Sequence, residues 1–262
     1  MKIENKISIV TVTLNAAETI SRCLKSIPDI PEIEHIVVDG RSDDGTEDVL
    51  NQYASSKKNL IFLQELESSG IYNAINYGVS IASGKYIQIV NGDDEFTGME
   101  YLYDILSQES SILIFKQKVF SGHHKIAEVG YKTSFSYPCQ SLPWAHGSML
   151  IHRKVYAKVG LYDVQYKLSS DLDWVNRALS YECEIKFFPY SISNFYMGGA
   201  STTTTKGLAE SFDIYKKWGG GTLSGRYNFF RSYLIKILAR IITWERLFNI
   251  KRKIKFKKGI WK

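Results

Sequence analysis

Cysteine is scarce in this sequence, and the few cysteines present form none of the patterns that cysteines usually serve. The 262 residues contain only Cys23, Cys139 and Cys183, which are odd in number and far apart. This spacing excludes a disulfide framework and CxxC-type metal ligation, and it favours a reducing, cytoplasmic setting. The first ten residues lack a long apolar segment followed by small residues, so we also expect no secretion signal there.

Two common phosphate-binding motifs are missing as well. No GxGxxG follows the apolar run at residues 7–13, and the segment from Gly78 to Lys85 has neither the spacing nor the Ser or Thr of a P-loop. We therefore expect no dinucleotide-type or P-loop nucleotide binding.

Charge is unevenly distributed along the chain. The net charge is +6, but residues 225–262 contain 12 Lys and Arg against the single acid Glu245, whereas residues 1–224 contain 21 basic and 26 acidic residues. The composition as a whole, 44% hydrophobic and 23% charged, is that of a globular protein rather than a disordered or collagen-like one. The pattern predicts a mildly acidic body with a basic end that contacts an anionic surface, either membrane or nucleic acid.

Short β-branched runs alternate with amphipathic stretches over the first hundred residues. This alternation is typical of βαβ units, so we predict an α/β fold with a mostly parallel central sheet flanked by helices. The predicted strands are 7–13, 33–38, 60–64 and 86–90, with helices at 17–26, 46–54 and 71–82 between them. Beyond Phe96 the pattern is irregular, with strands predicted at 112–120 and 185–188 and helices at 153–159 and 171–180.

Acidic residues follow two of the predicted strands. Asp39 ends the second strand, and Asp93 and Asp94 follow the fourth. Ligands of open α/β sheets bind beyond the carboxyl ends of the strands, so Asp39 and Asp93 are expected to face one crevice. Carboxylates there would repel a diphosphate unless Mn²⁺ or Mg²⁺ were bound between them. For Asp43 and Asp44, helix capping is an equal alternative.

Four sequence blocks resemble those of the inverting family 2 glycosyltransferases, in the same order and with similar spacing. The blocks are residues 8–15, 37–46, 70–84 and 91–94. The segment from His146 to Arg177 and the loop at 198–201 resemble the acceptor half more thinly, so the resemblance covers about residues 7–201. It is nearest to the bacterial branch that builds surface polysaccharides such as O-antigen, capsule or colanic acid. It implies the GT-A fold of nucleotide-diphospho-sugar transferases.

The resemblance implies a donor site with a divalent cation. The implied donor contacts are Thr13, Asn15, Asp39, Asn73, Asn76, Asn91 and Asp93. Among these, Asp39 would bind the nucleobase and Asp93 would bind Mn²⁺ or Mg²⁺, with Asp94 either a second metal ligand or a turn residue. The chain departs from the family pattern at Val12, Asn91 and Ser170, which stand where a proline and two acidic residues are usual. Since Asn91 carries no charge, we expect weaker metal binding than with two carboxylates.

The resemblance also implies an acceptor site with one catalytic carboxylate. Asp171 is the candidate general base, and its alternative role is that of a helix N-cap. Asp173 lies two residues on, and therefore on another face of the predicted helix, and it is a candidate contact to the acceptor or to phosphate. His146 contacts metal, phosphate or acceptor, or else makes only structural hydrogen bonds. Trp174 either stacks on an acceptor sugar or belongs to the core.

The last predicted element is a basic amphipathic helix. Within residues 228–248 apolar side chains fall on one helical face and basic ones on the other, and a run of basic residues follows at 251–258. Basic residues are too frequent for a membrane span, which needs about 20 mostly apolar residues. We expect the helix to lie on an anionic membrane, and the alternative is packing on the body of the protein.

Together these features predict a domain at residues 1–224 and a membrane-associating tail at 225–262. The domain would comprise a nucleotide-sugar half at 1–98 and an acceptor half at 99–224. The expected function is metal-dependent, inverting transfer of a hexose or N-acetylhexosamine from a nucleotide sugar, UDP-linked by family analogy, to a lipid-linked glycan at the inner face of the plasma membrane. The alternatives are a sugar-nucleotide-forming nucleotidyltransferase and a nucleic-acid or membrane-binding module without catalysis.

Overall fold

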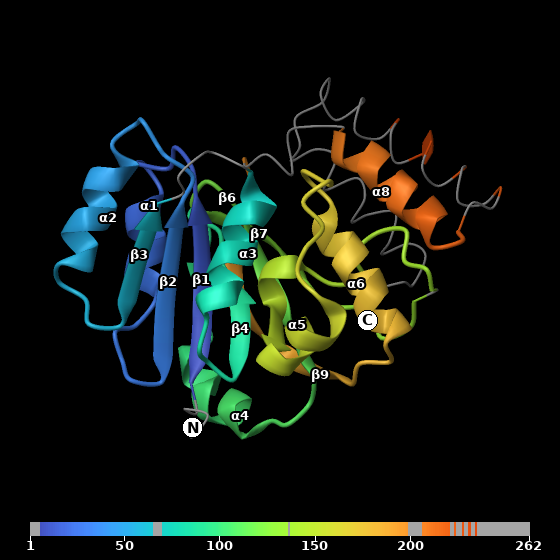
Figure 1. The fold of residues 1–262 in the computed structure, drawn as a ribbon, viewed down its shortest axis with the longest axis horizontal. Helices are drawn as coiled ribbons and strands as arrows, with labels where there is room; N and C mark the ends of the chain where they lie inside the picture. The colour runs from blue at the N-terminus through green and yellow to red at the C-terminus, as the bar shows by residue number, and fades with distance from the viewer. Residues whose placement is uncertain are drawn as a thin grey trace.

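The computed structural model describes residues 6–64, 70–135, 137–198 and 206–220, together with residues 223, 227, 230, 231 and 234. A nine-stranded sheet runs through these residues in the order β3-β2-β1-β4-β8-β6-β9-β5, and β7 pairs with β6 outside that path (Figure 1). Its parallel half consists of β1 (Ile7–Thr13), β2 (Ile33–Asp39), β3 (Leu60–Gln64) and β4 (Tyr86–Ile89). Strands β1 and β2 are buried along their whole length, which explains their nearly continuous apolar runs.

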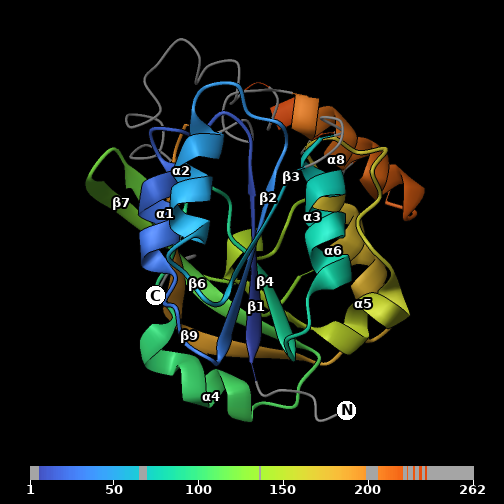
Figure 2. The same ribbon diagram turned by 60° about the vertical axis from the view of Figure 1, so that its left-hand side comes forward.

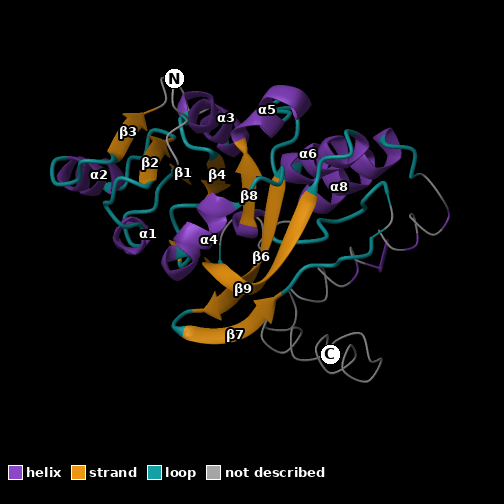
Figure 3. Ribbon diagram, turned by 90° about the horizontal axis from the view of Figure 1, so that it is seen from below, coloured by secondary structure: helices purple, strands orange, loops and turns teal. Residues whose placement is uncertain are grey.

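The second half of the sheet is mixed. It consists of β5 (Glu95–Phe96), β6 (Ile112–Ser121), β7 (His124–Val129), β8 (Met149–His152) and β9 (Ile185–Tyr196). Strand β8 runs antiparallel to both β4 and β6, while β9 runs parallel to β6 and pairs near its end with β5. Figure 3 shows β6 and β9 side by side, with β7 at the rim. Because β8 joins β4 to β6, the two halves share one continuous sheet.

Helices cover both faces of this sheet (Figure 2). One face carries α1 (Ile20–Ser26), α2 (Thr46–Ala54) and α4 (Leu102–Ser107), and the other carries α3 (Ile71–Ile81), α5 (Arg153–Val159) and α6 (Ser170–Ser180). Two short 3-10 turns, η1 (Met99–Tyr101) and η2 (His146–Ser148), precede α4 and β8. Helix α8 (Lys206–Lys217) packs on α6 through a small apolar cluster that includes Leu172 and Ile214. Each face of the sheet therefore has its own buried core.

The predicted elements of the first ninety residues are present, with the first helix beginning at Ile20 instead of Ala17. The strand predicted at 185–188 is much longer, because polar residues beyond Phe188 continue it to Tyr196. Strands β5 and β7 and helices α4 and α8 were not predicted. The tail helix predicted at 228–248 lies outside the described residues, apart from Phe230, Arg231 and Leu234. Within the ranges given above, no helix has the length and apolar composition needed to cross a bilayer.

Candidate functional site

The carboxyl ends of β1, β2 and β4 bring the acidic segments to one edge of the sheet. Thr13 at the end of β1 pairs with Asp39 at the end of β2. On the other side of β1, the Gly92 amide donates to the Val12 carbonyl at 3.0 Å. Asp39 and the Asn91–Asp94 loop therefore lie at the same edge, separated only by β1. This is the juxtaposition that the strand pattern predicted.

Thr13 and Gly92 are in close contact within this edge. A Cβ added to Gly92 would lie 2.8 Å from Thr13 Oγ1, so no larger residue fits there without movement. Thr13 is buried, and its hydroxyl has no hydrogen-bond partner among the described residues. Unpaired buried polar groups are rare in native proteins and usually have a functional or solvent explanation. The hydroxyl of Thr13 is thus a group that ligand or water binding would satisfy.

Asp39 is fully buried, and its carboxylate is occupied by the turn that follows β2. It accepts hydrogen bonds from the Ser42 amide at 2.8 Å and from the Ser42 hydroxyl at 2.5 Å. Asn15, which has a left-handed φ of 52°, links this turn to the β1–α1 loop. Its amide donates to Ser42 Oγ at 2.8 Å, and its side-chain oxygen accepts from the Asp43 amide at 3.0 Å. Asp39 and Asn15 together fix the two loops that border the edge.

Asp44 lies in the turn before α2, one residue before the N-cap Gly45. One carboxylate oxygen accepts from the Thr46 amide at 3.0 Å and from the Thr46 hydroxyl, and the other accepts from the Ala17 amide at 3.0 Å. The Thr46 hydroxyl contributes most to lowering the pKa of Asp44. Asp44 is therefore a turn residue that binds the first amide of α2, a structural role.

Asp93 and Asp94 differ in what their carboxylates contact. Asp94 is buried and accepts from the Tyr196 amide at 2.9 Å and from the Asn91 side-chain amide at 3.5 Å. Burial and the neighbouring charge of Asp93 raise the pKa of Asp94 well above its usual range. Asp93 is only partly buried, and burial raises its pKa while the charge of Arg22 opposes the rise.

The residues present fit a divalent cation held by one protein carboxylate. Arg22 holds the loop by donating to the Asp93 carbonyl at 2.6 Å, which leaves the Asp93 carboxylate outside that contact. Asp94 is already engaged by the Tyr196 amide and Asn91. In the described part of the chain, no three His, Cys, Asp or Glu side chains come together to hold a metal by themselves. A cation at Asp93 would thus take most of its ligands from water and substrate oxygens, as Mg²⁺ commonly does.

Helix α3 supplies the two asparagines predicted to face the donor, and they lie in different surroundings. Asn73 lies near the start of α3, in a small crevice that it lines with Gly70, Tyr72 and Tyr166. The side chain of Asn76 instead forms a pair of hydrogen bonds with the backbone of Tyr162. Asn76 Nδ2 donates to the Tyr162 carbonyl at 2.8 Å, and Asn76 Oδ1 accepts from the Tyr162 amide at 2.9 Å. Asn76 therefore joins α3 to the segment that follows α5.

Asp171 lies in the first turn of α6, against the start of α3. Its Oδ1 accepts from the Tyr72 hydroxyl at 3.2 Å and from the Leu172 amide at 2.9 Å. Burial raises the pKa of Asp171, and the opposing contributions of His146, the Leu172 amide and the Tyr72 hydroxyl are smaller. A carboxylate with a raised pKa is a stronger base once it is ionised, which suits proton abstraction from a hydroxyl.

His146 lies beside the same carboxylate, at the start of β8. The antiparallel pairing of β8 with β4 brings the preceding η2 turn to the end of β4, and the Gln88 side chain donates to the Gly147 carbonyl at 2.8 Å. His146 Nε2 forms a hydrogen bond of 2.9 Å with the Tyr162 hydroxyl, and burial lowers the pKa of the imidazole. Burial therefore disfavours the charged imidazole, and the hydrogen bond joins the η2 turn to Tyr162.

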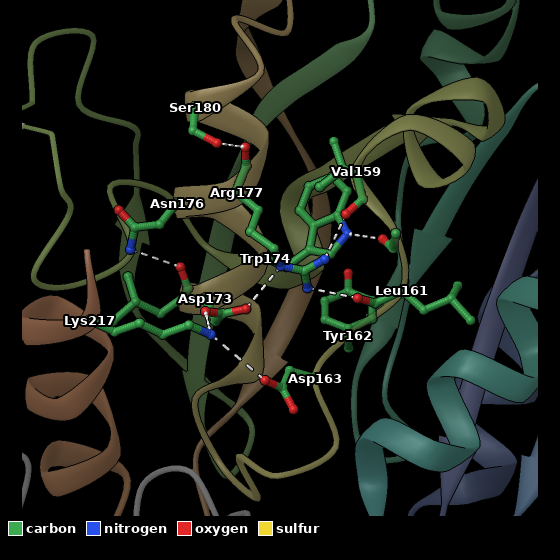
Figure 4. Close-up of polar contacts among 12 residues, drawn as sticks. Val159, Leu161, Tyr162, Asp163, Asp173, Trp174, Asn176, Arg177, Ser180 and Lys217 are labelled. Atoms are coloured by element: carbon green, nitrogen blue, oxygen red, sulfur yellow. Dashed lines mark hydrogen bonds and ion pairs between the residues drawn. The ribbon is translucent and has the colours of Figure 1, made fainter.

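Asp173 and Trp174 lie on the buried side of α6, as Figure 4 shows. Only 1% of the Asp173 side chain is exposed, and it is paired with Arg177 at 2.9 Å and Lys217 at 3.0 Å. The indole N–H of Trp174, which is fully buried, donates to the Gly160 carbonyl at 2.8 Å. Neither side chain is placed to touch an acceptor, because both face the protein interior.

Several residues that shape this site have no role predicted from the sequence. Tyr72 lies within the block at 70–84, one position before Asn73, and its hydroxyl contacts Asp171. Tyr162 lies in no recognised motif, and its place in the site follows only from its contacts with the side chains of Tyr72, Asn76, His146, Tyr156 and Trp174. Arg22 likewise has no sequence signal, since its contact with the Asp93 loop spans 71 positions.

Known glycosyltransferases are similar to this chain in sequence. A protein named PGL/p-HBAD biosynthesis glycosyltransferase, from Mycobacterium bovis, is 25% identical over 214 residues, which cover 75% of this chain and 79% of that protein. The poly(ribitol-phosphate) beta-glucosyltransferase of Bacillus spizizenii is 36% identical over 126 residues, which cover 45% of this chain but only 20% of that much longer protein.

Solved structures of S. aureus TarS have a similar fold. The crystal structure of TarS 1-349 in complex with UDP-GlcNAc matches with a TM-score of 0.65 and 17% identity, over 81% of this chain and 65% of that one, so this chain spans less than two thirds of its length. At such identity the likeness concerns the GT-A fold alone. The sequence model of Glycosyl transferase family 2, however, matches residues 8–152, which is more than half of the chain. This protein therefore belongs to glycosyl transferase family 2.

Proposed function

We propose that this protein is a metal-dependent, inverting glycosyltransferase that moves a hexose or N-acetylhexosamine from a UDP-sugar to a lipid-linked glycan in surface-polysaccharide synthesis. The observation that carries the proposal is the placement of Asp93 and Asp171. Asp93 follows β4, a parallel strand of the donor half, and Asp171 lies in the first turn of α6 in the acceptor half, where it accepts from Tyr72 at the start of α3. A donor diphosphate and an acceptor hydroxyl would meet between them.

The proposed reaction uses Asp171 as its base. Asp171 would take the proton of the acceptor hydroxyl as that oxygen attacks the anomeric carbon on the face opposite the leaving diphosphate. This in-line geometry inverts the configuration, so an α-linked donor would give a β-linked product. Tyr72 donates to Asp171 Oδ1 at 3.2 Å and would hold the carboxylate in position before the proton is transferred.

On the donor side, Asp93 would hold Mn²⁺ or Mg²⁺ together with phosphate oxygens, and the cation supplies positive charge to the departing diphosphate. Asp39 is the proposed nucleobase contact, and the base would replace the bonds that Ser42 now makes to it. Thr13, Asn15, Asn73 and Asn91 are the proposed contacts to the rest of the donor.

The names of similar proteins support the choice of substrates. The TarS structures are described as complexes with UDP-GlcNAc and with UDP, which favours a UDP-linked donor here. The matched sequence relatives are named for the synthesis of PGL/p-HBAD and for poly(ribitol-phosphate) glucosylation. These names support a cell-envelope glycan as the acceptor.

A membrane-bound acceptor would explain the pattern of the C-terminal segment. Leu223, Tyr227, Phe230 and Leu234 recur at helical spacing and are 55–85% exposed. Residues 225–262 also contain 12 basic residues, and each basic residue near an anionic surface contributes about 1 kcal/mol to binding. We propose that this segment holds the enzyme at the inner face of the plasma membrane.

The test combines donor binding with turnover. Thermal shift over a panel of nucleotide sugars, with Mn²⁺ or with EDTA, should identify a donor that stabilises the protein only when the cation is present. That donor should release UDP when lipid-linked saccharides are supplied. Asp171→Asn should bind the donor as the wild type does but release UDP at least 100-fold more slowly, because general base catalysis contributes about 10²–10⁴-fold. Wild-type turnover in Asp171→Asn would refute the mechanism.

A further inference from the structure

Three consecutive carbonyl groups, beginning with that of the last residue of α5, accept hydrogen bonds from side chains of α6. Arg177 donates from Nη1 to the Val159 carbonyl and from Nη2 to the Leu161 carbonyl, both at 2.7 Å. Trp174 donates to the Gly160 carbonyl between them (Figure 4). Gly160 has a φ of 87°, and a Cβ there would approach Arg177 Nη1 to 3.3 Å. The backbone from 159 to 161 is therefore shaped to fit the arginine fork.

A buried carboxylate fixes the other side of that fork. Asp173 Oδ2 accepts from Arg177 Nε at 2.9 Å, and Asp173 Oδ1 accepts from Lys217 at 3.0 Å and from the Trp218 indole at 3.2 Å. Asp173 is thus satisfied by three donors, two of which come from α8 and the residue after it. A buried charge of this kind holds its partners firmly, because losing one of them leaves an uncompensated charge in the interior.

Asp173, Trp174 and Arg177, with the backbone of 159–161 that they hold, form a clamp. Tyr162, the next residue along the chain, connects this clamp to the proposed base. Its amide and carbonyl are bound by Asn76, and its ring stacks on Tyr72 with centroids 5.7 Å apart. Its hydroxyl contacts His146 Nε2 at 2.9 Å. Tyr72 donates to Asp171 Oδ1, and His146 lies near enough to the same carboxylate to affect its pKa. The position of Tyr162 thus determines where Tyr72 and His146, the two neighbours of Asp171, are placed.

We propose that Asp173 and Arg177 are positioning residues for the base Asp171. Neither reaches the substrate, and both act through the backbone of 159–161 and the side chain of Tyr162. The inference rests on the proposed function, because it assigns the clamp a part in that reaction. Displacement of a reacting group by about 1 Å can lower the rate about 100-fold. Weakening the clamp should therefore lower kcat without changing the affinity for the donor.

Arg177→Lys is the main test, because lysine keeps the charge opposite Asp173 but cannot span two carbonyl groups. We expect kcat for UDP release to fall about 100-fold, with the Kd for the UDP-sugar within twofold of the wild type. Hydrogen exchange at the amides of 160–162 should accelerate. Asp213→Asn is the matched control, since it breaks an exposed ion pair with Lys216 on α8 and should change none of these quantities.

Each outcome distinguishes the clamp from a purely structural role. If Arg177→Lys folds and its amides at 160–162 exchange faster while kcat equals that of the wild type, the clamp does not position Asp171. If hydrogen exchange at these amides is unchanged, Arg177 does not hold the segment, and the proposed clamp is refuted. If Arg177→Lys does not fold, Trp174→Phe removes the bond to Gly160 and part of the buried ring, and it leaves the bonds of Arg177 and Asp173 in place. This variant should show a smaller loss of kcat than expected for Arg177→Lys, with faster hydrogen exchange at the amides of 160–162. Faster exchange with a wild-type kcat would overturn the inference. A wild-type protein that releases no UDP from any nucleotide sugar would refute the proposed function instead, and the exchange rates would still decide whether the clamp holds the segment.

Discussion

Replacing Tyr72 by Phe tests the environment of the proposed base with the least disturbance. The substitution removes one hydroxyl, which donates to Asp171 Oδ1 at 3.2 Å and accepts weakly from the Asp171 amide at 3.5 Å. The ring remains, so its stacking on Tyr162 is retained. Any change in activity should therefore come from the lost hydrogen bond to the carboxylate.

The expected effect is a shift of the pH dependence of kcat to higher pH. Hydrogen bonds to charged groups contribute about 1.5–3 kcal/mol, and a bond of 3.2 Å belongs at the lower end of that range. A loss of about 1.4 kcal/mol from the ionised form raises the pKa of Asp171 by about one unit. Asp171 has to be ionised to accept a proton, so the acid limb of kcat should move to higher pH by about one unit. The plateau at higher pH should change little.

UDP release measured from about pH 4 to pH 9 provides the assay. Tyr77→Phe is the matched control, because Tyr77 is an exposed tyrosine of the same helix and has no part in the site. The reasoning would be refuted if the acid limb of Tyr72→Phe coincided with that of the wild type, or if it moved to lower pH.

Three further predictions concern the metal, the packing of α3 and the tail. Asp93→Asn should abolish the strengthening of UDP binding by Mn²⁺ in calorimetry while leaving binding in EDTA unchanged; a persistent Mn²⁺ effect would contradict the assignment. Gly78→Ala would place a Cβ 2.4 Å from Val10 Cγ1 and should lower the free energy of unfolding in urea by about 1–3 kcal/mol, part of which Val10→Ala should restore. If Gly78→Ala and the wild type had the same free energy of unfolding, α3 would be able to shift away from Val10 without loss of stability. A chain ending at Ser224 should no longer sediment with anionic vesicles, and undiminished binding would exclude the tail as the anchor.

Local sequence patterns account well for the parallel half of the fold. The strands there are buried on both faces, so β1 and β2 read as nearly continuous apolar runs that are easy to recognise. Strand β9 is harder to recognise, because Ser191, Ser193 and Asn194 interrupt its apolar residues. Its length is determined by pairing with β6 and β5 instead, and such pairing leaves no periodic signal in a single segment.

The site could be located from the sequence more readily than its contacts. Asp39 and Asp93 share an edge because both follow parallel strands, which is a rule of topology. The partners of each carboxylate depend on packing between distant segments. Tyr72 and Asp171 are 99 positions apart, and Asn76 and Tyr162 are 86 apart. For this reason the sequence marked Asn76 and Asp173 as substrate contacts, whereas the structure places both in contacts between protein segments.

The link between Asp94 and Tyr196 has a consequence for how the chain folds. Its two partners are 102 positions apart, and the short strand β5 pairs with the last residues of β9 close by. During synthesis Asp94 is made about a hundred residues before Tyr196, so its carboxylate cannot yet accept the hydrogen bond from the Tyr196 amide. Contacts of such long range form late and slow folding. A fragment ending near residue 152, where the family match stops, would lack the strand that closes this loop and should not assemble a working donor edge.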